Sequence, residues 1–156
     1  MTCRVATRTD YDCLGQIMFR AIREGPSPYT DAQRRAWMPR VNAGPGWAAR
    51  LAQHHVVLSA EGPDIVGFMT VDPAGYIDLA YILPDARGQG RFAQLLDAVT
   101  EHARARTCAG LCTHASLMAQ PAFARHGFRV VRQETVIRSG ETLRRAEMYK
   151  SLKKEA

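Results

Sequence analysis

The segment from Ile82 to Leu96 constrains the fold of this chain more than any other part of it. An apolar stretch, Tyr76 to Leu83, ends at Pro84, and a short loop with Gly88 and Gly90 follows. A helix is expected next, because apolar residues recur at the spacing of one helical face. These residues are Phe92, Leu95, Leu96, Val99 and Ala103. The pattern predicts a strand, a flexible turn and the first turn of a helix.

A glycine-rich turn before a helix is suited to binding an anion. Glycine lets the backbone approach a ligand closely, and the first N–H groups of a helix have no partner within it. The helix dipole adds positive potential there, and Arg87 and Arg91 add formal charge. We therefore expect the backbone of residues 87–92 to cradle a phosphate.

Two other phosphate loops lack their required partners here. A P-loop needs a lysine after its last glycine, and no lysine lies near this turn. Gly88, Gly90 and Ala93 satisfy the dinucleotide fingerprint, which also needs an acidic residue about 20 positions later. Residues 107–114 contain none, and the motif lies in the middle of the chain rather than after its first strand.

Three segments together resemble the GNAT superfamily of acetyl-CoA-dependent N-acetyltransferases, in particular its bacterial stand-alone proteins. The run RGQGRF, Arg87–Phe92, is similar to the family's cofactor loop (R/Q-x-x-G-x-G/A) at every position but the last. The run Ser116–Phe128 keeps the alanine and the Gly-Phe pair of a later motif, with Ser116 for its Asn and Phe123 for its Tyr. Met148–Leu152 is similar to the family's final strand.

The resemblance implies an α/β fold of one domain, residues 1–156. A mixed, mostly antiparallel central sheet is flanked by helices, and two parallel strands splay apart to admit the pantetheine arm of the cofactor. The chain pattern predicts strands at 4–7, 55–60, 65–71, 76–83, 111–114, 128–138 and 143–152. Helices are predicted at 10–22, 31–37, 47–53 and 116–125, besides the one after the loop.

The resemblance also assigns cofactor-binding residues. Backbone groups of Ile82 and Leu83 pair with pantetheine, and Ser116 and Phe123 lie beside it. The pyrophosphate is held by the loop residues Arg87, Gly88, Gln89, Gly90, Arg91 and Phe92. A ring at Phe92 can crowd the phosphates, unless it points into the core and leaves its N–H free.

Acetyl transfer to an amine requires that the amine lose a proton and that the departing thiolate gain one. Asp78 is the candidate base, because it interrupts an apolar strand near the position where family members often carry a catalytic Glu. The usual proton-donating Tyr is replaced by Phe123, so Ser116, Tyr149 and Tyr81 are the candidate acids. The alternative for Asp78 is a solvent-facing or structurally hydrogen-bonded carboxylate. The alternative for Ser116 is the hydrogen bond by which the family's Asn positions the cofactor.

The expected function is transfer of an acetyl group from acetyl-CoA to a primary amine of a small molecule or a protein, by direct attack in a ternary complex. Tyr29, Gln33, Trp37 and Trp47 are candidates for acceptor recognition, or for simple packing. The alternative is a non-catalytic acyl-CoA-binding or sensory domain, which the phenylalanines at the two motif positions favour.

Composition limits the other partners. The net charge of +6 is spread along the chain, without the basic–aromatic interleaving of nucleic-acid modules, so no nucleic-acid partner is expected. The four cysteines form no C-x-x-C pair, and no metal site is expected. No apolar run has the length of a membrane span and no signal peptide is visible, so we expect a cytoplasmic protein. It is expected to be a monomer or a homodimer.

Overall fold

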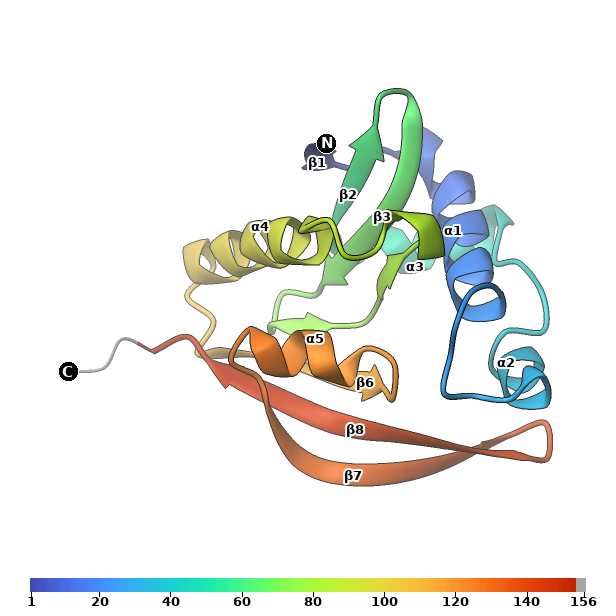
Figure 1. Ribbon diagram of the computed structural model, residues 1–156. Coiled ribbons are helices and arrows are strands. Elements are labelled where there is room, and N and C mark those ends of the chain that lie inside the picture. Colours follow the sequence, from blue (N-terminus) through green and yellow to red (C-terminus); the bar gives the residue numbers. More distant parts are fainter. Residues whose placement is uncertain (154–156) are drawn as a thin grey trace.

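The computed structural model describes residues 1–153 as two four-stranded sheets with helices packed on them (Figure 1). The strands are β1 (Thr2–Val5), β2 (His55–Glu61), β3 (Asp64–Val71), β4 (Tyr76–Ile77), β5 (Ala80–Ile82), β6 (Gly110–Ser116), β7 (Arg129–Arg138) and β8 (Glu141–Ser151). The helices are α1 (Tyr11–Arg23), α2 (Asp31–Trp37), α3 (Gly44–Ala52), α4 (Arg91–Ala105) and α5 (Gln120–Arg125). Short 3₁₀ turns precede α1 and follow β5.

The strands are divided between two sheets with orders β1-β2-β3-β5 and β4-β6-β8-β7. All pairs are antiparallel except β4 with β6, which is parallel. The α/β class and the mostly antiparallel pairing are thus as predicted. The prediction of one continuous strand at 76–83 was wrong, because the chain leaves the second sheet at Asp78 and joins the first as β5.

This change of sheet opens a gap between two parallel strands. β4 and β6 are paired only through Tyr76↔Cys112 and Ile77↔Thr113, and then β5 turns to pair with β3. The branch point is held by a buried hydrogen bond from the Thr113 hydroxyl to the Ile77 carbonyl (2.9 Å). We call the gap between β5 and the end of β6 the split. The predicted splaying of parallel strands is confirmed.

Two apolar clusters lie on opposite faces of the first sheet. Val57 and Met69 point to the cluster that α4 shares with the second sheet, whereas Leu58 and Phe68 point to the cluster under α1 and α3. This alternation follows from the two-residue period of a strand. α4 is amphipathic as predicted, and it buries Leu95, Leu96 and Val99 in the first of these clusters.

The boundaries of two elements differ from the prediction. Residue 116 ends a strand instead of beginning a helix, because β6 stays paired with β8 as far as Ser116↔Arg145. The helix α5 therefore covers only Gln120–Arg125. Helix α3 begins at Gly44, three residues earlier than predicted, with Pro45 in its first turn, where a missing N–H costs no helical hydrogen bond.

Two histidines from different elements are stacked where α4 lies over the start of β2. The rings of His55 and His102 are parallel, with centroids 3.7 Å apart and an interplanar angle of 2°. Burial lowers the pKa of both imidazoles, and the pKa of His55 is lowered further by His102. The folded chain thus binds protons at this pair less readily than the unfolded chain does.

This pair should make the fold less stable in mild acid. The free energy of unfolding is expected to fall as the pH drops below 6.5, the ordinary histidine pKa, because the unfolded state takes up more protons. Urea unfolding at about pH 7.5 and about pH 5 measures the effect. His102→Gln should flatten the pH dependence in this window, and an unchanged dependence would contradict the assignment.

Candidate cofactor and active site

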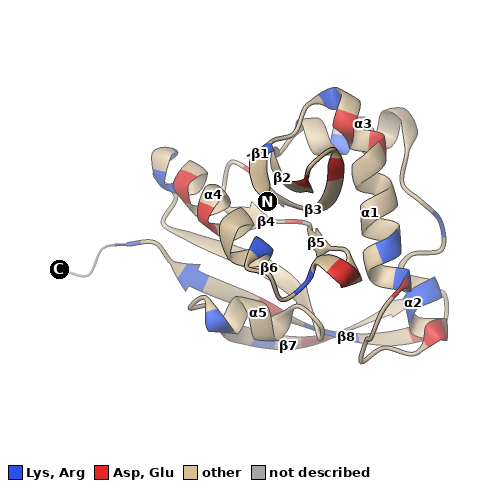
Figure 2. Cartoon of the chain, turned by 45° about the horizontal axis from the view of Figure 1, so that its top comes forward, with Lys and Arg blue, Asp and Glu red and all other residues tan. Residues whose placement is uncertain are grey.

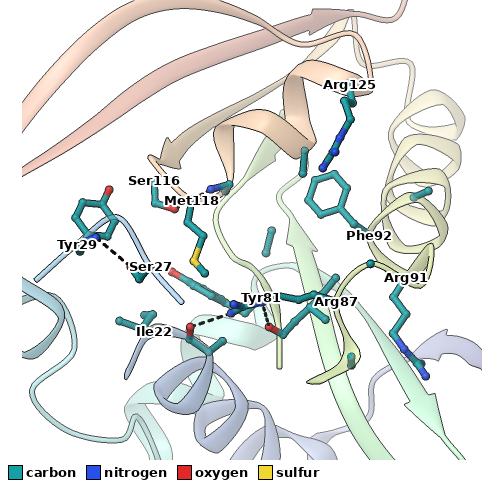
Figure 3. Close-up of a pocket in the computed structure, with 18 of the residues that line it drawn as sticks. Ile22, Ser27, Tyr29, Tyr81, Arg87, Arg91, Phe92, Ser116, Met118 and Arg125 are labelled. Atoms are coloured by element: carbon teal, nitrogen blue, oxygen red, sulfur yellow. Dashed lines mark hydrogen bonds between the residues drawn. The ribbon is translucent and has the colours of Figure 1, made fainter. Parts of the chain in front are cut away.

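A cavity of about 440 Å³ passes through the split. One end is formed by the turn before α4, the walls by β5 and the end of β6, and the other side by α1, α2 and the segment between them (Figure 3). Its walls combine the apolar side chains of Ile22, Ile82 and Met118 with the phenols of Tyr29 and Tyr81. Such a narrow, mostly apolar cleft with polar groups at one end suits a long ligand with an anionic head.

The turn at residues 87–92, which we call the cofactor loop, has the backbone of an anion cradle. Gly88 and Gly90 have φ of +74° and +83°, and no atom lies within 4 Å of where a Cβ would stand on either. Gly90 is the N-cap of α4 and supplies no side-chain cap, and the first turn contains no acidic residue. The N–H groups of the first turn are therefore available to an anion.

Both arginines of the cofactor loop line the cavity, and their guanidinium groups are held by hydrogen bonds within the protein. Arg91 is 4% exposed and donates to the Ser59 hydroxyl (2.9 Å) and the Glu61 carboxylate (2.5 Å). Its side chain runs away from the cavity in Figure 3. Arg87 donates to the carbonyls of Ile82 (3.0 Å) and Ala21 (3.1 Å), so it joins β5 to the C-terminal turn of α1.

Of the two residues predicted to pair with pantetheine, Ile82 has its backbone groups directed toward the split and Leu83 does not. Leu83 N donates to Val66 O (2.8 Å), and Leu79 O accepts from Thr70 N (2.9 Å), so these residues face β3. Because strand residues alternate in direction, Ala80 and Ile82 present their backbone to the split. Leu83 is 8% exposed, belongs to the core under α1 and is not part of the cavity wall.

Gln89 of the cofactor loop also lies outside the cavity wall, and its side-chain amide donates to Asp85 O.

The two motif phenylalanines form one aromatic cluster. The ring of Phe92 meets the edge of Phe123 at 5.0 Å and 86°, and lies 5.6 Å from the His126 ring. Phe92 remains part of the cavity wall, and its ring packs against the rings of Phe123 and His126. Phe123 is 1% exposed and lies in the core, so it does not reach the cavity as the cofactor-binding assignment required.

The candidate catalytic residues lie in three different places. Ser116 lines the cavity, and its hydroxyl accepts from Ala119 N (3.2 Å) in the turn before α5. Tyr149 covers Gly110 on β6 and is not in the cavity wall. Asp78 is also outside the wall, and its carboxylate accepts from Nε (3.1 Å) and Nη2 (2.9 Å) of Arg50.

The structure adds wall residues that sequence reasoning missed. Ser27, Arg34, Met118, Arg125 and His126 belong to the cavity wall, and the last three lie in the Ser116–Phe128 run at positions that its motif leaves open. Their positions follow from the packing of the 24–30 segment and α5 around the split, for which the sequence holds no local signal. No Asp or Glu of the described residues is in the wall, so the cavity itself offers no carboxylate base.

Three of the four residues named for acceptor recognition do reach the cavity. Tyr29, Gln33 and Trp37 line it, and the Tyr29 hydroxyl donates to Arg144 O (2.6 Å) and accepts from Leu117 N (2.9 Å). Trp47 instead packs in the core, 5% exposed, with its indole N–H bonded to Tyr11 O. Burial raises the pKa of Tyr81 to about 12, so its phenol is a neutral hydrogen-bond donor in the cavity wall.

Within residues 1–153 no group of three or more metal-ligating side chains is found. Nor does any helix of that part of the chain have the length and apolar character to span a membrane. Acidic and basic positions are interspersed over helices and strands in Figure 2 rather than collected in one basic stripe.

The split, the uncapped helix α4 and the glycine turn before it are the features that an acyltransferase of this fold requires. A model of the acetyltransferase (GNAT) domain matches residues 26–150. The chain belongs to the GNAT family of acetyltransferases, and the prediction of an acyltransferase is confirmed. No curated protein sequence matches the chain.

Solved structures agree with this membership. The chain is similar to a GCN5-related N-acetyltransferase from Rhodopseudomonas palustris, with 28% identity, a TM-score of 0.89, and 97% and 95% of the two chains covered. A putative acetyltransferase from Salmonella typhimurium, solved with its cofactor acetyl-CoA, shares 19% identity at a TM-score of 0.71, covering 100% and 96%. A ribosomal-protein-alanine N-acetyltransferase from Brucella melitensis shares 20% at 0.70, covering 97% and 100%. The last two show the common fold.

Proposed function

We propose that this chain transfers the acetyl group of acetyl-CoA to a primary amine of a small molecule or protein, by direct attack in a ternary complex. The observation that carries the proposal is the cavity that joins the cofactor loop to the split. A long cofactor with a pyrophosphate group fits this shape, because the anionic part meets the helix N-terminus and the thin arm enters between strands.

The cofactor is oriented by chain geometry. β5 leads directly into the cofactor loop, so an arm that starts at the loop runs back along β5 toward the branch point at Ile77 and Thr113. The backbone of Ala80 and Ile82 faces that arm. This arrangement brings the thioester, which supplies the activated acetyl group, to the inner end of the split.

The amine acceptor enters from the side of the cavity that lies under α2. Tyr29, Gln33 and Trp37 form that part of the wall with Tyr81. The Tyr29 and Gln33 side chains are fixed by hydrogen bonds to the backbone of β8, at Arg144 O (2.6 Å) and Thr142 O (2.8 Å). Holding the amine against the thioester supplies rate through proximity. We assign protonation of the departing sulfur to the neutral Tyr81 phenol or the Ser116 hydroxyl, which both line the cavity.

A direct test combines binding and turnover. Coenzyme A should raise the melting temperature of the protein, and a panel of primary amines should release free thiol from acetyl-CoA faster with the enzyme than without it. Thermal protection without thiol release from any amine would favour a non-catalytic acyl-CoA sensor. That alternative is favoured by one specific observation, the absence of a carboxylate from the described cavity wall. Absence of both signals would contradict the proposal.

A further inference from the structure

Three polar side chains are joined on the face of the second sheet that points away from the core. Nδ1 of His114 on β6 lies 2.7 Å from the hydroxyl of Tyr76 on β4. On the other side of the ring, Nε2 lies 3.2 Å from Oε1 of Glu134 on β7. Side-chain exposures of 27% for His114 and 18% for Glu134 leave this group half-buried. Among the described residues Oε1 of Glu134 has no hydrogen-bond partner, and the carboxylate also lies near Arg132 (3.5 Å) and Arg145 (3.7 Å), so Glu134 acts on the imidazole as a nearby negative charge.

This group lies at the inner end of the split. The ladder between β4 and β6 ends at Ile77↔Thr113, so His114 is the first residue of β6 beyond it. Leu111, Thr113 and Ala115 are buried toward the core, and His114 and Ser116 share the opposite side of β6. Ser116 lines the cavity, whereas Tyr76, His114 and Glu134 lie on the same side of the sheet beyond the cavity wall.

We propose that Tyr76, His114 and Glu134 form a proton relay that takes the proton from the attacking amine. This inference rests on the proposed acetyltransferase function. It assigns to β4, β6 and β7 the task that the sequence had assigned to Asp78. In the relay, Tyr76 receives the proton of the amine, and His114 and Glu134 act through it as positioning residues.

Asp78 is less suited to that task, although it is the neighbouring carboxylate. Two hydrogen bonds from Arg50 occupy one of its oxygens, and His54 Nε2 lies 3.8 Å from the same oxygen. In contrast, the Tyr76 hydroxyl already shares a hydrogen bond with His114 Nδ1, which accepts it when the imidazole carries its proton on Nε2. The charged and titratable groups around His114 come from three other strands and the segment after β4: Tyr76, Asp78, Arg132, Glu134, Arg145 and Glu147.

Acetyl transfer through the relay moves one proton from the amine to solvent. The neutral amine nitrogen forms a bond to the thioester carbonyl carbon, and the C–S bond breaks with its electron pair leaving on sulfur. The positive nitrogen gives a proton to the Tyr76 oxygen while the Tyr76 proton passes to Nδ1 of His114, and Glu134 stabilises the imidazolium. His114 returns its proton to solvent, and the thiolate gains one. The net products are an amide and the free thiol.

Three variants test the relay against the best amine of the panel. His114→Gln, Tyr76→Phe and Glu134→Gln should each lower kcat, by about a hundredfold for His114→Gln. KM for acetyl-CoA and the thermal shift with coenzyme A should stay near the wild-type values, which also shows that each variant folds. After correction for ionisation of the amine acceptor, the pH profile of kcat/KM should differ between His114→Gln and the wild type, which a purely structural histidine would not cause. Glu24→Gln, on the surface of the segment after α1, is the control and should match the wild type.

The outcomes separate the two proposals. Wild-type thiol release that His114→Gln and Tyr76→Phe leave unchanged would overturn the relay and keep the acetyltransferase. Loss of turnover in Asp78→Asn, with turnover and the corrected pH profile retained in His114→Gln, would overturn the relay in favour of Asp78. No thiol release by the wild type from any amine would overturn the proposed function, and the relay with it.

Discussion

Gly88→Val is expected to remove acetyl-CoA binding from a protein that still folds. A β-carbon on Gly88 would project into open space at the cofactor loop, where no atom lies within 4 Å. We assign that space to the pyrophosphate, so a valine there blocks the anion and moves the backbone N–H groups away from it. The dissociation constant, measured by calorimetric titration, should rise at least about tenfold, equivalent to about 1.4 kcal/mol.

Gly62→Val is the matched control for this effect. Gly62, in the turn between β2 and β3, also has a positive φ (+57°) and open space around its missing Cβ. Both substitutions should cost about 1–2 kcal/mol of stability through the left-handed backbone. Only Gly88→Val should lose the cofactor. Equal affinity in the two variants would place the pyrophosphate elsewhere.

Phe123→Ala should produce the largest loss of stability among single substitutions near the site. The side chain is 1% exposed and meets the rings of Phe92 and Phe128 edge-on, at 5.0 and 4.9 Å. Removing a fully buried phenylalanine leaves a cavity and typically costs about 3–5 kcal/mol. The free energy of unfolding from urea titration measures the change.

Phe19→Ala on α1 is a suitable comparison, because Phe19 is only partly buried and is covered by the guanidinium of Arg23. Its cost should be well below that of Phe123→Ala, about 1 kcal/mol. A Phe123→Ala protein with wild-type stability but weakened acetyl-CoA binding would contradict the core placement and restore its assignment to the cofactor site.

The parts of the fold that were predictable from sequence are those fixed by local chemistry. The two glycines of the cofactor loop have the positive φ that L side chains rarely adopt. The spacing of Leu95, Leu96 and Val99 defines the buried face of α4. Thr30 caps α2 through its hydrogen bond with Gln33 N, and α2 ends at Trp37 as predicted. Each of these depends on residues within a few positions of one another.

The errors concern side chains whose direction is decided by distant partners. Arg91 is drawn to Ser59 and Glu61, more than two dozen residues earlier, and Asp78 to Arg50 on α3. The break in the strand at Asp78 depends on two sheets competing for one segment, since β3 pairs with one half of it and β6 with the other. No local pattern signals such a competition.

The candidate site shows the same division. The loop residues Gly88 and Gly90 and the strand residue Ile82 border the cavity. Tyr76, His114 and Glu134 carry no motif and meet only when β4, β6 and β7 are in one sheet. His114 alone is indistinguishable in sequence from a structural histidine. Its two partners, one on each ring nitrogen, are what single it out.

A crystal structure with acetyl-CoA bound tests the central claim most directly. We predict that the pyrophosphate accepts hydrogen bonds from backbone N–H groups of residues 88–92. The pantetheine arm should lie in the split, against the backbone of Ala80 and Ile82. The thioester should then lie at the inner end, near the branch point at Ile77 and Thr113. A cofactor bound outside the split, or a pyrophosphate without contact to the cofactor loop, would contradict it.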